Sequence, residues 1–387
     1  DWLILNSIKG QIRALSDAGA AWGMRNTQKI GTLDNSGTIL GQVDDSGARG
    51  AEFEGSGSGY TIGTINNSGT MSGVAGVNNA YGLILKSRET GTINNSGIIN
   101  ATATSQNSYG VKIESQGTDI TVENFNNTGT ISASSGTTLS YGVYLYNYYS
   151  DVTITNFTNT GTISSSVGSG SNVYDIETSN GWGGNNIITN LNNSQGKDGN
   201  DVLTYKGKLP TNYNVIVNST SDYGQISFNS ATGTTNFGVY NTSTLSGGTT
   251  YASVIQGIAT AKIGATRTGT LGSCSWTLQL QDGETTVWDL VVANTRTGYT
   301  SRISSNKKSK IAAILEAMNT AGKNSAVTSA LDGLSDAKFN KALSQIEGVT
   351  VKSMNGNSFQ KHSSFKRAVS STLSAPSVSS LTKNNYA

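Results

Sequence analysis

The sequence predicts an all-β fold: a right-handed parallel β-helix (β-solenoid) with a β-rich C-terminal cap and a short helical, partly flexible tail. A large apolar residue followed two positions later by Asn recurs six times, and in five copies a glycine follows the Asn after two more residues. The steps between these glycines, counted from Gly10, are 27, 32, 28, 32 and 32 residues, in the range of solenoid repeats. A second marker, which contains glycine and in most copies Tyr-Gly, lies 13 residues after most of these glycines.

The apolar residue before each Asn predicts the end of the first strand of a coil, and the Asn begins the turn that follows. Because the Asn residues recur at the same corner of successive coils, we expect their amides to form a structural ladder of hydrogen bonds along the axis. The ladder residues are Asn35, Asn67, Asn95, Asn127, Asn159 and Asn193. Glycine and Asn are expected at these turns because both tolerate a positive φ, glycine at no steric cost.

The second strand of each coil follows the turn glycine, and the third follows the second marker. The second strand is expected to begin at the apolar residue after the turn, such as Ile39 or Met71, and the third after the second marker. Alternation in the third strand predicts that one set of side chains stacks in the core and that most of the other set faces water. The expected core pairs are Ala51/Phe53, Leu83/Leu85, Val111/Ile113 and Val143/Leu145, and the expected outward pairs are Glu52/Glu54, Ile84/Lys86, Lys112/Glu114 and Tyr144/Tyr146.

Four segments are expected: repetitive coils over 1–201, a β-rich cap over 202–306, short helices over 307–354 and a basic flexible tail over 355–387. In the cap, β-structure of a second kind is predicted, with alternating strands near 214–218, 224–229, 237–240, 250–258, 276–281 and 286–293. The open end of a solenoid exposes backbone groups and apolar side chains. We therefore expect Trp276 and Trp288 to help seal it.

Charge and periodicity both change near Asn306. Residues 1–306 carry a formal charge of −5 and residues 307–387 one of +7, which together make the +2 of the chain. The first helix is predicted from an apolar stripe at Ile311, Ile314, Leu315 and Met318. Ser335 is expected to cap a second helix that Gly348 ends. The buried face of that helix would hold Phe339, Ala342, Leu343 and Ile346.

The composition agrees with an extended secreted protein. Only 35% of the 387 residues are apolar and 13% are charged, while 47 are glycine. The single cysteine, Cys274, excludes an intramolecular disulfide framework and a cysteine-rich zinc site. No stretch is long and apolar enough to span a bilayer as a helix. The chain begins without the basic region and apolar core of a signal peptide, so we expect that any such segment has been removed.

Three features follow one another along the chain: coils of the type Asn-Asn-Ser-Gly-Thr-Ile, then the segments 223–226, 245–251 and 288–292, then short helices with Leu-Ser-Asp-Ala at 334–337. In this order, over nearly the whole chain, they resemble the passenger of a bacterial type V autotransporter. The repeat style is most similar to passengers of the vacuolating-cytotoxin-like kind. The end departs from the family, because no membrane barrel of alternating strands follows and the last residue is Ala387 rather than an aromatic residue.

The resemblance implies export through the periplasm and the outer membrane, an extracellular or bacterial cell-surface location, and an outer-membrane β-barrel in the precursor. It also implies a cap that helps nucleate folding outside the cell. We expect a structural and adhesive role, with host or neighbouring-cell surface molecules as partners. A self-assembling extracellular fibre subunit, in which copies of the chain stack end to end, and a toxin-like passenger are the alternatives.

Catalysis, cofactors and nucleic acid partners are not expected. The only histidine, His362, lies in the predicted tail, so a Ser-His-Asp triad or a His-based metal site would depend on it alone. The basic residues are not clustered with interleaved aromatic residues, as nucleic acid binding would need. Glu52 and Glu54 would suit glycoside cleavage only within a cleft.

Two surface features are candidates for binding. Residues 196–203 match one copy of a nine-residue calcium-binding coil, with Asp198, Asn200 and Asp201 as candidate Ca²⁺ ligands, and a simple turn is the alternative. The second feature is a dense aromatic patch that would contact a glycan or a protein, unless its rings merely cover a neighbouring loop. The patch residues are Tyr144, Tyr146, Tyr148 and Tyr149.

Overall fold

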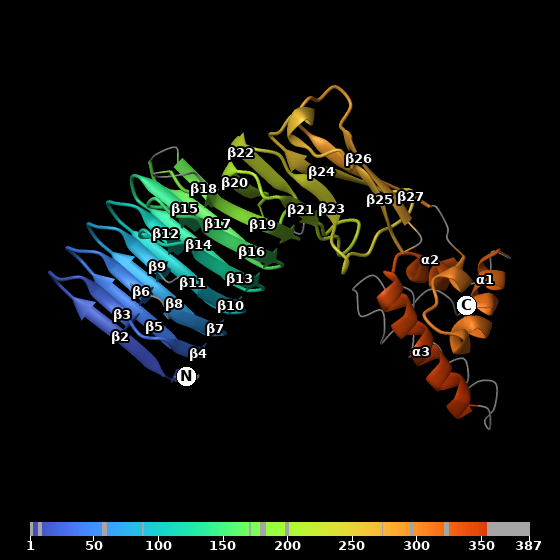
Figure 1. Cartoon of the computed structure of the whole chain (residues 1–387), viewed down its shortest axis with the longest axis horizontal. Coiled ribbons are helices and arrows are strands. Elements are labelled where there is room, and N and C mark those ends of the chain that lie inside the picture. The colour runs from blue at the N-terminus through green and yellow to red at the C-terminus, as the bar shows by residue number, and fades with distance from the viewer. Residues whose placement is uncertain are drawn as a thin grey trace, which may run out of the picture.

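The structure, a computed structural model, describes residues 3–6, 10–55, 60–86, 89–169, 172–178, 183–197, 201–272, 274–294, 298–320 and 325–353. Figure 1 shows strands stacked side by side along most of the molecule, followed by a group of helices. The predicted all-β fold class is confirmed: parallel sheets stack as a β-solenoid of about 7 turns, and a short helical tail follows.

Three sheets form the faces of the solenoid, and each complete coil adds one strand to each sheet. Sheet A contains, in spatial order, β1 (Leu3–Asn6), β4 (Ile30–Asn35), β7 (Thr61–Asn67), β10 (Glu89–Asn95), β13 (Ile120–Asn127), β16 (Val152–Asn159), β19 (Asn186–Asn193), β21 (Asn212–Val215) and β23 (Asn236–Val239). Sheet B contains β2 (Gln11–Ser16), β5 (Thr38–Val43), β8 (Thr70–Ala75), β11 (Ile98–Ala103), β14 (Thr130–Ser135) and β17 (Thr162–Val167).

Sheet C has the most strands and changes its pairing at one end. Its parallel strands are β3 (Ala21–Asn26), β6 (Ala48–Glu54), β9 (Ala80–Lys86), β12 (Ser108–Glu114), β15 (Leu139–Tyr146), β18 (Asn172–Thr178), β20 (Leu203–Lys208), β22 (Ile226–Thr232) and β24 (Thr250–Gln256). Antiparallel pairing then joins β24 to β27 (Trp288–Asn294), β26 (Cys274–Leu280) and β25 (Thr268–Leu271). A 3₁₀ turn, Thr260–Lys262, lies between β24 and β25.

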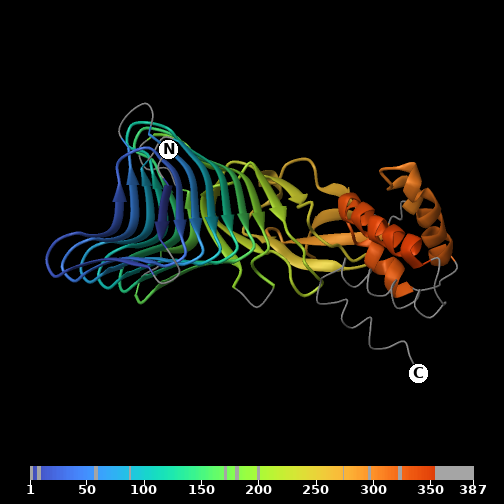
Figure 2. The same ribbon diagram turned by 90° about the horizontal axis from the view of Figure 1, so that it is seen from below.

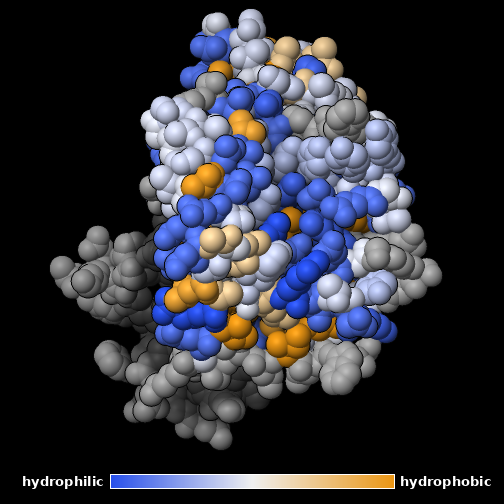
Figure 3. Space-filling view, turned by 90° about the vertical axis from the view of Figure 1, so that its left-hand side faces the viewer, coloured by the Kyte–Doolittle hydropathy of each residue, from blue (hydrophilic) through white to orange (hydrophobic). Residues whose placement is uncertain are grey.

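Equivalent residues of successive coils stack on one another and fill the core. Phe125 lies between Ile93 and Phe157 in sheet A, and the ring centroids of the two phenylalanines are 4.6 Å apart. The predicted core residues of the third strand, such as Val111, are fully buried. Burying one large apolar side chain stabilises a protein by about 1.5–3 kcal/mol. On the face in Figure 3, hydrophobic residues form separate areas within a mostly hydrophilic surface.

The inward Asn residues form the predicted ladder at the corner between sheets A and B. The side-chain amide of each residue donates to the Oδ1 of the next, at 2.7, 2.8, 2.8, 2.8 and 3.1 Å from Asn35 to Asn193. Asn67 also donates to the backbone carbonyl of Ile98 at 3.1 Å. All six Asn residues are buried. Each rung therefore satisfies polar groups that have no access to bulk water.

The reason for glycine at these turns differs from the predicted one. Neither Gly37 nor Gly69 has a positive φ, and the ladder Asn residues do not either. A Cβ atom on Gly69 would instead lie 2.0 Å from the carbonyl oxygen of Gly37 in the neighbouring coil. Glycine is needed here because the backbones of successive coils approach too closely for a side chain, and not because of the turn conformation.

The predicted boundary near residue 201 marks the end of sheet B alone. Among the described residues, sheet B ends with β17, whereas β20 to β24 continue the parallel pairing of sheets A and C. β-structure of a second, antiparallel kind begins only where β24 meets β27. The prediction for 202–306 was therefore wrong for its first half, because the chain omits one strand per coil there without leaving the solenoid.

Asp175 occupies a position that is glycine in the previous coil, and its side chain fits because no described strand of sheet B lies opposite it. The register pairs Tyr141 with Tyr174, so Asp175 stands where the previous coil has Gly142. A Cβ atom on Gly142 would lie 2.5 Å from Cγ2 of Ile163 in sheet B. Beyond β17 that obstacle is gone, and the buried Asp175 carboxylate accepts hydrogen bonds from the Thr204 N–H at 2.8 Å and the Ser165 hydroxyl at 3.1 Å.

The antiparallel strands cover the apolar end of the coils. Trp276 and Trp288 are buried in the same hydrophobic core as the coil residues. The Trp288 Nε1–H donates to the carbonyl of Ile258 at 2.9 Å, and the ring of Trp276 meets that of Phe237 edge-on at 5.5 Å. Both tryptophans thus pack against the core at the end of the coils, the position expected of a cap.

The helices have a separate small core. α1 (Ser309–Thr320), α2 (Ser325–Asp332) and α3 (Asp336–Ser353) follow the 3₁₀ turns Tyr299–Ser301 and Asn306–Lys308. They pack around Tyr299 and Phe339, whose rings stack at 5.4 Å. Figure 2 shows them at the opposite end of the molecule from the first coils. Within the described ranges, no helix is long and apolar enough to cross a membrane.

Two details of the predicted helices were wrong. Ile314 is 59% exposed: Leu315 of the predicted stripe is buried, and Ala312 rather than Ile314 shares the buried face of α1. Gly348 does not end its helix, since α3 continues to Ser353. The Ser335 cap is present, with the Lys338 N–H 3.5 Å from the Ser335 hydroxyl. The predicted tail, 355–387, lies outside the described residues together with His362.

Candidate functional site

The outer face of sheet C carries a line of tyrosine rings. Tyr81, Tyr109, Tyr141 and Tyr174, named here the tyrosine row, occupy one register position in β9, β12, β15 and β18. Successive ring centroids lie 5.1, 6.0 and 6.5 Å apart. Such aromatic pairs contribute about 0.5–1.5 kcal/mol beyond the area that they bury. The first three rings of the row are buried although they stand on the outside of the sheet.

The predicted aromatic patch continues directly from the tyrosine row. The ring of Tyr144 lies 5.4 Å from that of Tyr109. From Tyr144 the contacts run to Tyr146 at 5.6 Å, on to Tyr148 at 6.1 Å and to Tyr149 at 5.5 Å. The four patch residues are thus brought together. Tyr144 and Tyr146 are half-buried, whereas Tyr148 and Tyr149 are 42% and 68% exposed.

The backbone holds the two exposed rings in place. The Tyr148 N–H donates to the Ser115 hydroxyl at 3.0 Å, and the Tyr148 carbonyl accepts from the Gly117 N–H at 3.1 Å. Both partners belong to the preceding coil. Tyr149 has a φ of 65°, in the left-handed region that costs a residue other than glycine roughly 1–2 kcal/mol. The contacts with the neighbouring coil therefore maintain an unfavourable backbone conformation that presents Tyr149 to solvent.

Lys112 lies among the rings of this face. Its Nζ is 5.4 Å from the ring centroid of Tyr109, 4.8 Å from that of Tyr146, and 3.0 Å from the Glu114 carboxylate. Burial lowers the pKa of Lys112, and the neighbouring Glu114 opposes this shift. A desolvated cation over aromatic rings contributes about 2 kcal/mol or more. The patch therefore presents aromatic faces around Lys112, whose charge is paired with Glu114.

Toward the first coils, the same face becomes charged. Arg49 follows Trp22 in the register and lies 5.1 Å from its ring. Glu52 accepts a hydrogen bond from Trp22 and pairs with Arg49 at 3.0 Å and Lys86 at 3.2 Å. Glu52 and Ile84 are buried, although both belong to the set of side chains of which most were expected to face water. Glu52 is covered by these partners, and Ile84 packs in one cluster with the first three rings of the tyrosine row.

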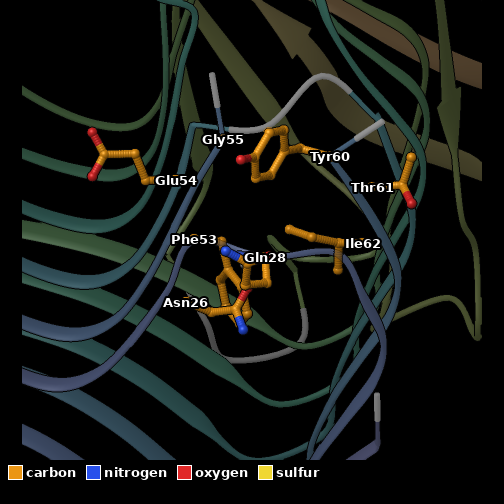
Figure 4. Close-up of a pocket in the computed structure, with 8 residues that line it drawn as sticks. All are labelled: Asn26, Gln28, Phe53, Glu54, Gly55, Tyr60, Thr61 and Ile62. Atoms are coloured by element: carbon orange, nitrogen blue, oxygen red, sulfur yellow. Dashed lines mark hydrogen bonds between the residues drawn. The ribbon is translucent and has the colours of Figure 1, made fainter. Parts of the chain in front are cut away.

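The recess beside Glu54 is too small to hold a sugar. Glu54 pairs with Arg25 at 2.6 Å, and this hydrogen bond lowers the pKa of Glu54. The recess beside it measures about 10 Å³, which is room for about one water molecule. The residues lining that recess are Asn26, Gln28, Phe53, Glu54, Gly55, Tyr60, Thr61 and Ile62. In Figure 4 the Glu54 carboxylate points away from the recess.

The candidate calcium ligands are only partly described. Asp198 and Asn200 lie outside the described residues. The backbone carbonyl of Asp201 accepts a hydrogen bond from Gln195 Nε2 at 3.1 Å, and Asp201 lines a cavity of about 320 Å³ together with Asp175. In the part of the chain that the structure describes, no group of three His, Cys, Asp or Glu residues could hold a metal ion. A calcium site at these three residues stays a prediction.

Sequence reasoning missed the tyrosine row and Lys112. The Tyr-Gly marker recurs 13 residues after the turn glycine, so its tyrosines had to share one column of the sheet. The face that they occupy was not evident, because Tyr109 lies outside while Val111, two residues later, lies in the core. The glycine between them interrupts the alternation from which faces are assigned.

Comparisons with known proteins do not place the chain in a family: no protein-family model, curated protein or solved structure matches it. Any function must be inferred from the residues of this chain.

Proposed function

We propose that this protein is an extracellular, surface-displayed β-solenoid with a structural and adhesive role, that it is the passenger of a type V autotransporter, and that it is not an enzyme. The observation that carries the adhesive role is the exposed end of the aromatic patch at Tyr148 and Tyr149. Tyrosine is favoured in contact surfaces because its large ring buries much area and loses little conformational entropy.

The solenoid supports adhesion by fixing the patch on a stiff support. Contact residues are held most accurately on regular elements whose side chains are packed from behind. Here Tyr144 and Tyr146 stand on β15, whose inward residues Val143 and Leu145 are fully buried. The partner would be a protein or glycan on a host or neighbouring cell.

The autotransporter assignment is supported by the order of the parts along the chain. Repetitive coils come first, a β-rich end with Trp276 and Trp288 follows, and short helices come last. This is the order on which the resemblance rests. Protease treatment of intact cells of the organism that makes the protein tests display. Digestion before lysis is expected, and protection until lysis would contradict a surface location.

Adhesion is tested by flow cytometry with the labelled chain on epithelial cells and on bacterial cells. The double variant Tyr148→Ser, Tyr149→Ser should reduce binding about tenfold, because truncating a contact hot spot costs more than 1 kcal/mol. Val77→Ser with Ile98→Ser is the matched control, since it removes two apolar side chains that are 47% and 46% exposed elsewhere on the coils. Equal binding by the two double variants would contradict a role for the patch.

A further inference from the structure

A second surface, on the outer face of sheet A, forms a polar groove of about 400 Å³. It is named here the amide groove, and its lining residues are Asn124, Asn126, Asn156, Thr158, Asn190, Asn192, Asn214 and Tyr240. All except Tyr240 stand on the adjacent strands β13, β16, β19 and β21, which Figure 1 shows side by side. Tyr240 directly follows β23. These residues are separate from the inward Asn ladder and from the aromatic patch on sheet C.

Two columns of hydrogen-bonded side chains line the amide groove. In the first column, Asn156 donates to Asn124 at 3.1 Å and accepts from Asn190 at 2.9 Å. In the second, Asn192 donates to Thr158 at 3.0 Å and accepts from Asn214 at 2.9 Å. A primary amide has two N–H donors and two acceptor lone pairs. The column bonds of Asn156 use one donor and one acceptor, so the other two are available to a ligand in the groove.

The lining of the groove disfavours two classes of ligand. None of the lining side chains is charged, so an ionic ligand would lose hydration there without gaining an ion pair. An extended peptide usually binds a sheet by adding a strand at an open edge. All four strands beneath the groove are paired on both sides, so no backbone edge is open to a peptide here.

We propose that the amide groove binds a neutral oligosaccharide. Sugar hydroxyls both donate and accept hydrogen bonds, as the lining amides do. Successive amides of a column are separated by one strand spacing, roughly 4.8 Å. This distance is comparable with the length of a pyranose ring, so neighbouring sugars would meet neighbouring rungs. The ring of Tyr240 offers an apolar surface for the C–H face of a sugar, as in sites where a few polar groups orient a ligand against aromatic rings.

The test begins with the full labelled chain on an array of neutral oligosaccharides built from hexoses and N-acetylhexosamines, printed beside sialylated and sulfated ones. Binding confined to neutral glycans is expected. Failure of every neutral glycan to bind, or a preference for the charged ones, would overturn the proposal. The double variant at Tyr148 and Tyr149 should bind the neutral glycans as the parent does, and loss of that binding would place the glycan on the aromatic patch and overturn the proposal.

Calorimetric titration of the best neutral glycan then locates the site. Asn126→Ala and Tyr240→Ala should each raise Kd about tenfold. Asn94→Ala is the matched control: Asn94 donates to Asn66 at 2.8 Å, just as Asn126 donates to Asn94 at 2.9 Å, but Asn94 does not line the groove. An unchanged Kd for Asn94→Ala is expected. If the Asn94 and Asn126 variants raise Kd equally, the loss comes from the hydrogen-bonded column and the groove proposal is overturned. If either Asn variant unfolds, the Kd of Tyr240→Ala decides the test.

Discussion

The side-chain amide of Gln195 takes the place of a missing strand beside Ile163. Its Nε2 donates to the Ile163 carbonyl at 2.9 Å, and its Oε1 accepts from the Ile163 N–H at 2.8 Å. A parallel neighbour would offer these same two main-chain groups one donor and one acceptor. Because sheet B ends at β17, the sixth turn reads Ser194-Gln195-Gly196 where earlier coils have Ser-Gly or Thr-Gly. Gln195, which departs from the repeat, therefore supplies the hydrogen bonds that the next strand of sheet B would have made.

Replacing Gln195 with Leu should lower the free energy of unfolding by about 2–6 kcal/mol. Both Ile163 groups would be left buried without partners, and each such loss costs about 1–3 kcal/mol. Gln225→Leu is the control, because the Gln225 amide makes a hydrogen bond to Ala252 at 2.9 Å that is exposed. Chemical denaturation measures both variants. Equal losses would mean that Gln195 does not substitute for a strand.

The inward and outward Asn residues of one strand should differ in their effect on stability. Asn127 is fully buried and bonds to Asn95 and Asn159 at 2.8 Å each. Asn127→Ala should therefore cost about 1–3 kcal/mol. Its neighbour Asn126 is half-buried and can exchange its lost bond for water, so Asn126→Ala should cost clearly less. Melting temperatures test this, and a parent-like Asn127→Ala would show that the ladder is not stabilising.

The coils were predictable because the repeated residues of the sequence define how successive coils align. A residue that recurs at a fixed offset must stack on its copies, which located the Asn ladder and core residues such as Phe125. The burial of Glu52 was not predictable in this way. It depends on Trp22 and Lys86, which come from two different neighbouring coils and carry no repeated signal. Contacts between unlike residues of adjacent coils became evident only with the register of the whole sheet.

The continuation of the solenoid past residue 201 was also not predictable from the sequence. The turn motif marks the corner between sheets A and B, so it disappears when sheet B ends. Sheets A and C go on without it, through β20 and β21 and their successors. The candidate patch was partly predictable, since its tyrosines are close in sequence. The amide groove was not, because Tyr240 reaches it from outside the repeats.

The stability of the protein should fall with rising pH through the titration of Asp175. Burial raises the pKa of Asp175 from 3.8 to about 6. A carboxyl group whose pKa is higher in the folded state binds its proton more tightly there, so its contribution favours folding below pH 3.8 and is lost as pH rises through 6. The loss is at most about 3 kcal/mol.

Asp175→Asn should remove this component of the pH dependence. Denaturation of the parent and the variant between pH 4 and pH 7, roughly the window set by the two pKa values, gives the difference curve. Asp282→Asn, at an exposed carboxylate, is the matched control variant. Parallel curves for the parent and Asp175→Asn would show that the carboxylate does not titrate in this window.

A chain that ends at residue 201 should not form a soluble solenoid. Truncation there removes β21 from β19 and β20 from β18, which leaves two open strand edges beside the core residues Leu191 and Ile176. Open edges next to apolar side chains favour aggregation. A chain that ends at residue 294 keeps β24 to β27, with Trp276 and Trp288 over the core, and should stay monodisperse. Light scattering and limited proteolysis compare the two chains. Soluble, protease-resistant coils from residues 1–201 would show that the strands beyond sheet B are not needed to protect the end of the solenoid.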